Sequence, residues 1–180
     1  MGETPLVDME RLVDACSFDD SGRCAVSCLE VRPEVREMCA SGRCRQYGRN
    51  WACPPACGTL EEYRQRISAY ADCCVVQTVG TLEDEFDIEG MMHFEQVHKE
   101  RVMQLADALH AQGADALVLA AGTCTLCPEC SCPDAPCRFP KRRLVSMEAA
   151  GLLVSDVCTQ AGVAYNHGKG TVAYTSCVLM

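Results

Sequence analysis

The sequence predicts an α/β fold in which a small sheet contains a β–α–β crossover. Three observations lead to this fold class: a long stretch with helical apolar spacing at residues 85–112, a short apolar stretch on each side of it, and 16 cysteines, most of them in the first third and in one later loop. A chain of 180 residues can bury a sizeable core without disulfides. We therefore expect a single domain over residues 1–180, with an irregular cysteine-rich region at 1–58 and an α/β core at 59–180.

The first region combines dense cysteines with glycine and proline residues that interrupt regular structure. Its cysteines are Cys16, Cys24, Cys28, Cys39, Cys44, Cys53 and Cys57. We expect no single continuous element across it. The core then begins with a helix, because Thr59 followed by Glu62 forms a capping-box pattern and apolar residues recur at helical spacing up to residue 70. A short buried strand at 73–79 follows.

The clearest element is the helix at residues 85–112. Its apolar stripe contains Met91, Phe94, His98, Val102, Leu105 and Leu109. Packing alone explains this stripe, so His98 is interpreted as a core residue and not as a metal ligand. Gly113 is a suitable helix stop, and residues 116–120 form a second apolar strand. Strand, helix and strand make one β–α–β crossover.

A cysteine-rich loop at residues 122–140 follows the second strand, at the carboxyl end where open α/β sheets place their ligands. Beyond it we expect a helical turn near 146–150, a short helix at 155–161 ended by Gly162, and a closing strand at 171–179. Glu148 and Gly151 are interpreted as residues that cap and position the following helix. A catalytic role is not assigned to either.

Charge and cysteine usage narrow the classes of function. The formal net charge of −9 argues against binding to nucleic acid or to an anionic membrane surface. No apolar stretch approaches the roughly 20 residues of a membrane span, and no secretory signal is recognised, so we expect a cytoplasmic protein. In a reducing cytoplasm, abundant thiols indicate metal ligation or redox chemistry more often than disulfides.

The strongest motif is the run of Cys124, Cys127 and Cys130 at C-x2-C-x2-C spacing. This spacing is typical of ferredoxins, in which three thiolates on a tight loop and one distant cysteine hold a [4Fe-4S] cluster. Cys137 is the preferred fourth ligand because a proline-containing turn precedes it, and Cys132 is the alternative. A structural zinc site would also use four thiolates and remains the alternative cofactor.

A second constellation consists of Cys39, Cys44, Cys53 and Cys57, four thiols within nineteen residues. Its spacing matches no common zinc module or ferredoxin run, so buried free thiols are the alternative. Closure of a cluster by Cys57 would make an electron relay, which we favour. Without Cys57, one iron would stay open to substrate, water or another ligand, as in an enzyme.

These motifs, in this order, resemble a cysteine-rich family of predicted metal-binding proteins of unknown function from anaerobic bacteria and archaea. The residues that carry the resemblance lie between about 32 and 179 and include Tyr47-Gly48, Trp51, Cys53-Pro54-Pro55, Gly122, Pro136-Cys137-Arg138, Pro140 and Ser146-Met147-Glu148-Ala149. The resemblance implies metal binding by Cys39, Cys44, Cys53, Cys124, Cys127, Cys130 and Cys137. It leaves outside the pattern Cys57, Cys132, Cys16, Cys24, Cys28, Cys73, Cys74, Cys158 and Cys177.

The resulting expectation is an iron–sulfur protein with one or two [4Fe-4S] clusters that passes electrons to or from a redox partner protein in anaerobic metabolism. A zinc-stabilised binding module without redox function and an enzyme with an open-iron cluster are the alternatives. Signatures of radical enzymes, phosphate loops and dinucleotide-binding folds are absent from the sequence. Whether the protein is an enzyme stays open at this point.

Overall fold

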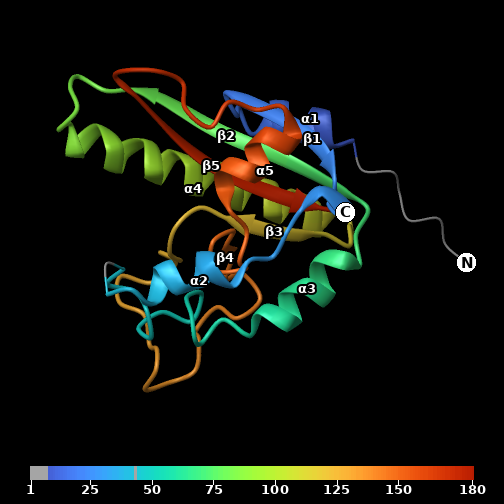
Figure 1. The fold of residues 1–180 in the computed structure, drawn as a ribbon, viewed down its shortest axis with the longest axis vertical. Coiled ribbons are helices and arrows are strands. Elements are labelled where there is room, and N and C mark those ends of the chain that lie inside the picture. The colour runs from blue at the N-terminus through green and yellow to red at the C-terminus, as the bar shows by residue number, and fades with distance from the viewer. Residues whose placement is uncertain (1–7, 43) are drawn as a thin grey trace, which may run out of the picture.

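The computed structural model describes residues 8–42 and 44–180 (Figure 1). Its strands are β1 (Asp20–Ala25), β2 (Asp72–Thr81), β3 (Leu117–Ala120), β4 (Val145–Ser146) and β5 (Thr171–Leu179). Its helices are α1 (Met9–Ala15), η1 (Val26–Cys28, a 3-10 helix), α2 (Pro33–Ala40), α3 (Leu60–Ser68), α4 (Ile88–Ala111) and α5 (Val154–Ala161). The strands form one mixed sheet in the order β1-β2-β5-β3-β4. The predicted α/β fold class is confirmed.

The crossover expected from the sequence is formed by β2, α4 and β3. Strands β2 and β3 both pair antiparallel with β5, so they run parallel to each other with β5 between them. The last residues of β5 explain its central place, because Cys177, Val178 and Leu179 are at most 1% exposed and need cover on both faces.

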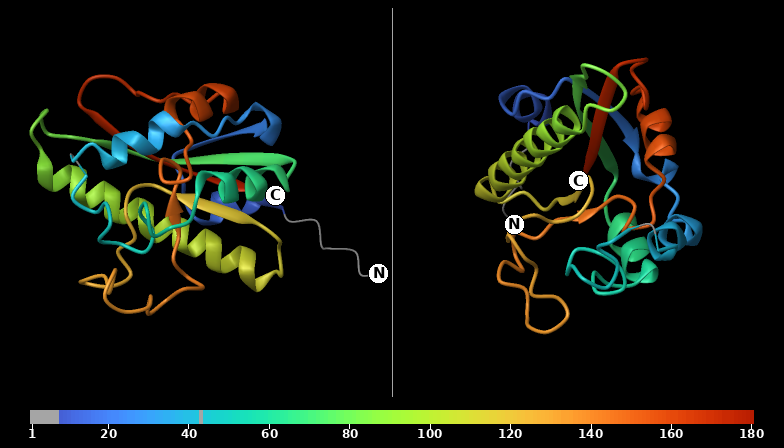
Figure 2. Two further views of the ribbon diagram at one scale, coloured as in Figure 1. Left: turned by 60° about the horizontal axis from the view of Figure 1, so that its bottom comes forward. Right: turned by 90° about the vertical axis from the view of Figure 1, so that its left-hand side faces the viewer.

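Alternating side chains of the central strands belong to two separate hydrophobic cores, one on each face of the sheet. On one face Cys74, Val76 and Val178 pack with residues of α1 and α4. On the other face Val75 and Leu179 pack with residues of α3 and α5. The sheet therefore lies between two helical layers, as the right-hand view of Figure 2 shows.

Local signals set the ends of the helices. Thr59 caps α3 with both hydrogen bonds of the predicted capping box to Glu62. Helix α4 begins later than expected, because the Asp87 side chain accepts a hydrogen bond from the Gly90 amide at 2.8 Å and so acts as the cap. The left-handed backbone of Gly162, with φ of 71°, ends α5 as predicted.

The first region contains more regular structure than the sequence suggested, namely α1, β1, η1 and α2. Strand β1 has alternating exposure and pairs with β2, which places Cys24 opposite Cys73. Gly22 permits this strand to approach α5, because a Cβ there would lie 2.2 Å from the carbonyl oxygen of Ala161. Irregular backbone is concentrated in the described part of residues 41–59.

Two long irregular segments, the described part of residues 41–59 after α2 and residues 121–144 after β3, lie side by side at the lower edge of the sheet in Figure 1. The Asn50 side chain donates to the carbonyl oxygen of Cys124 at 3.0 Å, and the Trp51 indole donates to that of Ala135 at 2.9 Å. These bonds hold the two cysteine-rich segments together. None of the described helices has the length and apolar character needed to cross a membrane.

Candidate metal centre

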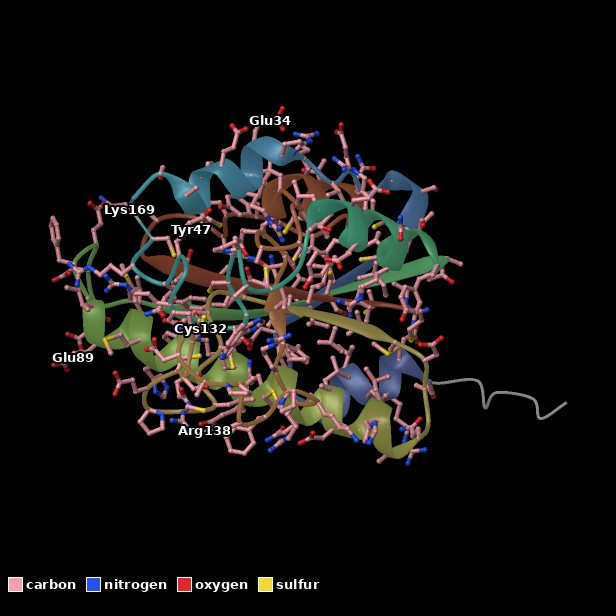
Figure 3. All side chains as sticks on the ribbon, turned by 90° about the horizontal axis from the view of Figure 1, so that it is seen from below. Glu34, Tyr47, Glu89, Cys132, Arg138 and Lys169 are labelled. Carbon is pink, nitrogen blue, oxygen red and sulfur yellow. The ribbon has the colours of Figure 1, made fainter. Side chains whose placement is uncertain are left out.

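The two cysteine-rich segments build one face of the molecule, viewed from below in Figure 3. Tyr47 from the first segment, and Cys132 and Arg138 from the second, are labelled on this face. Cys39 lies near the end of α2, whereas Cys124 follows β3 by a short connection. The sheet and α2 thus fix the points from which both segments start.

Four of the predicted ligands share one small cavity. Cys124, Cys127, Cys130 and Cys137, hereafter the four-cysteine set, line a cavity of about 20 Å³. Burial raises the pKa of the Cys124 thiol, and the charges of the other three sulfurs raise it further. The four sulfurs therefore lie near enough to interact, as the sequence spacing predicts. The cavity in this shape has room for about one water-sized atom.

A second cavity, of about 380 Å³, is lined by Cys39, Cys44 and Cys53, hereafter the three-cysteine set. Burial raises the pKa of the Cys53 thiol to about 11, and the charges of the neighbouring thiols add to this shift. The Cys53 Sγ lies 3.4 Å from the Thr123 hydroxyl, which lowers the pKa of the thiol in part. Because metals bind the thiolate, uptake at this set must release protons.

Cys57, the fourth cysteine predicted for the first segment, does not line the cavity of the three-cysteine set. Its Sγ lies 3.4 Å from Arg36 Nη2, which donates to it, and it belongs to the wall of a different cavity together with Tyr63. The Tyr63 hydroxyl donates to the Cys57 carbonyl at 3.0 Å. Cys57 is thus buried beside a different cavity, although its charge still raises the pKa of both Cys39 and Cys53, so it lies near the three-cysteine set.

Cys132, the alternative fourth ligand of the second segment, does not line the four-cysteine cavity. Its Sγ is 3.8 Å from the carbonyl oxygen of Gly48, and Cys137 lines the four-cysteine cavity in its place. This arrangement agrees with the preference for Cys137.

Several other cysteines belong to the sheet and its cores. Cys24, Cys73 and Cys177 form a chain of neighbouring thiols in which burial and thiol contacts raise the pKa of Cys24 to about 12. Cys74 and Cys158 are buried on β2 and α5. Thiols in such surroundings act as small apolar side chains.

His98 is a core residue, as the apolar stripe predicted. Its ring nitrogens lie 3.0 Å from the Thr78 hydroxyl and 2.8 Å from that of Ser176. Burial lowers the pKa of His98 to about 3, with further lowering by the charges of Arg101 and Lys99. Both nitrogens are occupied, and the ring stays neutral near pH 7.

Two side chains that the sequence analysis left without a site role border the cysteine cavities. Arg143 Nε and Glu148 Oε2 are buried and have no hydrogen-bond partner within the described part of the chain. Arg143 lines the four-cysteine cavity, and Glu148 lines the cavity of the three-cysteine set.

The prediction that Glu148 caps the next helix is wrong. The cap of α5 is Leu153, and no side chain hydrogen-bonds there. Gly151 has a packing role instead, because a Cβ at this position would lie 2.7 Å from Leu60 Cδ2 and 2.9 Å from Val31 Cγ1. The missing hydrogen-bond partner in three dimensions distinguishes Glu148, which in the sequence stands out only as one residue of the motif Ser146-Met147-Glu148-Ala149.

The donor types at both cavities fit a thiolate-bound metal group. Within residues 8–42 and 44–180, no three side chains of His, Cys, Asp or Glu are already placed to hold a single ion. The sulfurs line the two cavities without surrounding one point, so binding of a single ion would draw them together.

The family described as "Predicted metal-binding protein (DUF2284)" matches residues 23–180. Neither the curated proteins nor the solved structures give a significant match to the chain. The match includes all eight cysteines of the two predicted constellations and nearly the whole described fold. The chain therefore belongs to the DUF2284 family of predicted metal-binding proteins.

Proposed function

We propose that this protein is a cytoplasmic iron–sulfur protein that passes electrons to or from a partner protein. In this proposal the four-cysteine set holds one [4Fe-4S] cluster, and the three-cysteine set binds a second through three of its irons. The observation that carries the proposal is that Cys124, Cys127 and Cys130, spaced as in ferredoxins, line one cavity together with Cys137.

The two sets are neighbours, which suits transfer of an electron between them. Thr123 lies in the wall of the three-cysteine cavity, and the next residue, Cys124, lies in the wall of the other. The Asn50 amide, which donates to the Cys124 carbonyl, fixes this shared wall from the opposite segment. A cluster at each set would thus be separated by a single stretch of backbone.

Charge around the four-cysteine set supports an anionic occupant. A cubane with four thiolates carries net negative charge, and nearby cations raise its reduction potential. Arg138 and Arg143 both line the cavity. Arg143 Nε is buried and has no hydrogen-bond partner among the residues described, so an anionic group beside it would satisfy a donor that is otherwise unpaired.

Exposed apolar side chains near the cavities support a protein partner. Met38 and Tyr47 line the three-cysteine cavity and are 56% and 40% exposed, and Phe139 beside the other cavity is 44% exposed. Large exposed side chains around a functional site are typical of a docking surface. The partner would approach the face shown in Figure 3.

A structural zinc ion at the four-cysteine set is the second candidate. The cavity of about 20 Å³ has room for one atom, whereas a cubane requires the segment from Cys124 to Cys137 to open around it. Four thiolates are also a common ligand set for structural zinc.

Metal analysis separates the candidates. The protein is purified without oxygen, and iron, acid-labile sulfide and zinc are measured per chain. The proposal expects iron and sulfide in about equal amounts, roughly four of each per cluster, with broad visible absorption. Stoichiometric zinc without sulfide, persisting after anaerobic reconstitution with ferrous iron and sulfide, would contradict it.

A further inference from the structure

The backbone around Glu148 is fixed on several sides. Directly after β4, the Ala150 amide donates to the Ser146 carbonyl at 3.0 Å, and the Ala149 amide donates to the Ser146 hydroxyl at 3.1 Å. From α2, the Arg36 guanidinium donates to the Ala149 carbonyl through Nε at 3.0 Å. The position of Glu148 is therefore set by the sheet and by α2 together.

From this position the side chain reaches the three-cysteine set. Glu148 lines the same cavity as Cys39, Cys44 and Cys53. The cavity thus presents three sulfurs and one carboxylate. Cys57 does not line it.

The carboxylate atom Oε2 is buried and has no hydrogen-bond partner in the described chain. Arg36 donates to the carbonyl of the next residue, Ala149, and its remaining donors are also used by groups other than Glu148. Nη1 donates to the Gly58 carbonyl at 2.6 Å, while Nη2 donates to Cys57 Sγ and to the Ala149 carbonyl. A buried, unpaired carboxylate oxygen is costly, so its place calls for a group that the described residues do not supply.

We propose that Glu148 is the fourth protein ligand of the metal group at the three-cysteine set, bound through Oε2. A metal cation is the partner that such an atom lacks, and carboxylates coordinate both iron and zinc beside thiolates. Glu148 takes the place that the sequence pattern offered to Cys57. The inference rests on the proposed function in one respect, namely that a metal group binds at this set.

This ligand set makes the two sites chemically different. Four soft thiolates close the four-cysteine site, whereas the harder carboxylate at the other site is the ligand most readily exchanged. The three-cysteine site is thus the one at which a small anionic or oxygen-bearing molecule can reach the metal. Its cavity of about 380 Å³ leaves room for such a molecule.

The test compares wild type with Glu148→Gln and Glu148→Cys, and uses Glu89→Gln, at an exposed position on α4, as the matched control. Each protein is loaded anaerobically with ferrous iron and sulfide. Loss of iron to a chelator is then followed together with the electron paramagnetic resonance spectrum. Parallel variants Cys39→Ser and Cys127→Ser identify which spectral features belong to which set.

We expect Glu148→Gln to release the metal of the three-cysteine set at least about tenfold faster than wild type, with the other set unchanged. Glu148→Cys should restore retention and alter the spectrum of that set alone. Glu89→Gln should behave as wild type. Equal release rates and spectra for Glu148→Gln and wild type would overturn the assignment while leaving the proposed function intact. Absence of metal at the three-cysteine set of wild type would overturn both.

Stability without metal gives a second, independent readout. Because Oε2 is unpaired in the metal-free protein, Glu148→Gln should unfold there at the same or a higher denaturant concentration than wild type. In the metal-loaded protein, Glu148→Gln should instead unfold at a lower denaturant concentration than wild type. A lower midpoint for Glu148→Gln in both states would mean that Glu148 serves only to hold the fold, and the assignment would fail.

Discussion

The thiol of Cys53 and the hydroxyl of Thr123 meet at 3.4 Å between Sγ and Oγ1, and this contact joins the two cysteine-rich segments. Thr123 immediately precedes Cys124, the first residue of the four-cysteine set. A single hydroxyl thus lies between the sulfurs of one set and the backbone of the other. Changes at Thr123 are expected to reach both sites.

Replacement of Thr123 by Val removes this hydroxyl at nearly constant volume. The hydroxyl lowers the pKa of Cys53, which burial has raised to about 11, so its loss should raise that pKa further. Since metal binds the thiolate, the pH at which the three-cysteine set takes up metal should move upward. Metal titrations at several pH values check this, and Thr125→Val, at an exposed position nearby, is the control. An unchanged pH profile would show that the contact is irrelevant to metal uptake.

Cys127→Ser should abolish metal binding at the four-cysteine set, because a hydroxyl does not replace a thiolate ligand. It should also lower the folded population of the loaded protein, since ligand binding energy is partly folding energy. Cys177→Ala is the comparison: this residue is fully buried on β5, so the change should cost about 1–3 kcal/mol of stability while metal content stays the same. Iron and sulfide analysis of both variants measures which of the two residues is needed for metal binding. Metal loss in Cys177→Ala combined with full metal in Cys127→Ser would refute the ligand assignment.

Cys57→Ala should leave the spectra of both sites unchanged, because the Cys57 thiol accepts from Arg36 and does not line the three-cysteine cavity. Loss of this buried sulfur should cost about 1–2 kcal/mol. Absorption and electron paramagnetic resonance spectra of the loaded variant are the measurement. If the variant loses one cluster, Cys57 is a ligand, as the sequence suggested, and its exclusion from the three-cysteine set is wrong.

His98 should make the stability of the metal-free protein depend on pH. Its pKa in the folded protein, about 3, lies below the ordinary value of 6.5, so the folded state disfavours the proton that the unfolded state binds. The free energy of unfolding should therefore fall as the pH drops below 6.5, by up to about 1.4 kcal/mol per pH unit from this residue.

Denaturant unfolding between roughly pH 4 and 7 checks this slope. His98→Gln should show a shallower slope than wild type, whereas His110→Gln, at an exposed position in the last turn of α4, should not. Equal slopes for wild type and His98→Gln would contradict the explanation.

Elements with local signals were predicted closely from the sequence. Helix α3 follows from the capping box of Thr59 and Glu62, and β5 occupies the predicted residues 171–179, a stretch rich in β-branched residues. The spacing of Cys124, Cys127 and Cys130 likewise predicted a shared cavity, since a tight loop keeps close neighbours together.

Features that depend on contacts between residues distant in the chain could not be predicted from the sequence. The place of β5 between β2 and β3 is set by burial on both faces, which only the assembled layers create. The Cys57 thiol is directed by Arg36, which lies 21 residues away in sequence, and the environment of Glu148 requires α2, β4 and the first cysteine segment together. Spacing along the chain contains no information about these partners.

The position of β5 also has a consequence for biosynthesis. Strands β2 and β3 do not pair with each other, and each needs residues 171–179 as its neighbour in the sheet. During translation both cysteine-rich segments leave the ribosome before this strand does, and contacts so distant in sequence form slowly. The cysteines of both segments are therefore synthesised before the sheet is complete, and their arrangement around the two cavities waits for the last strand.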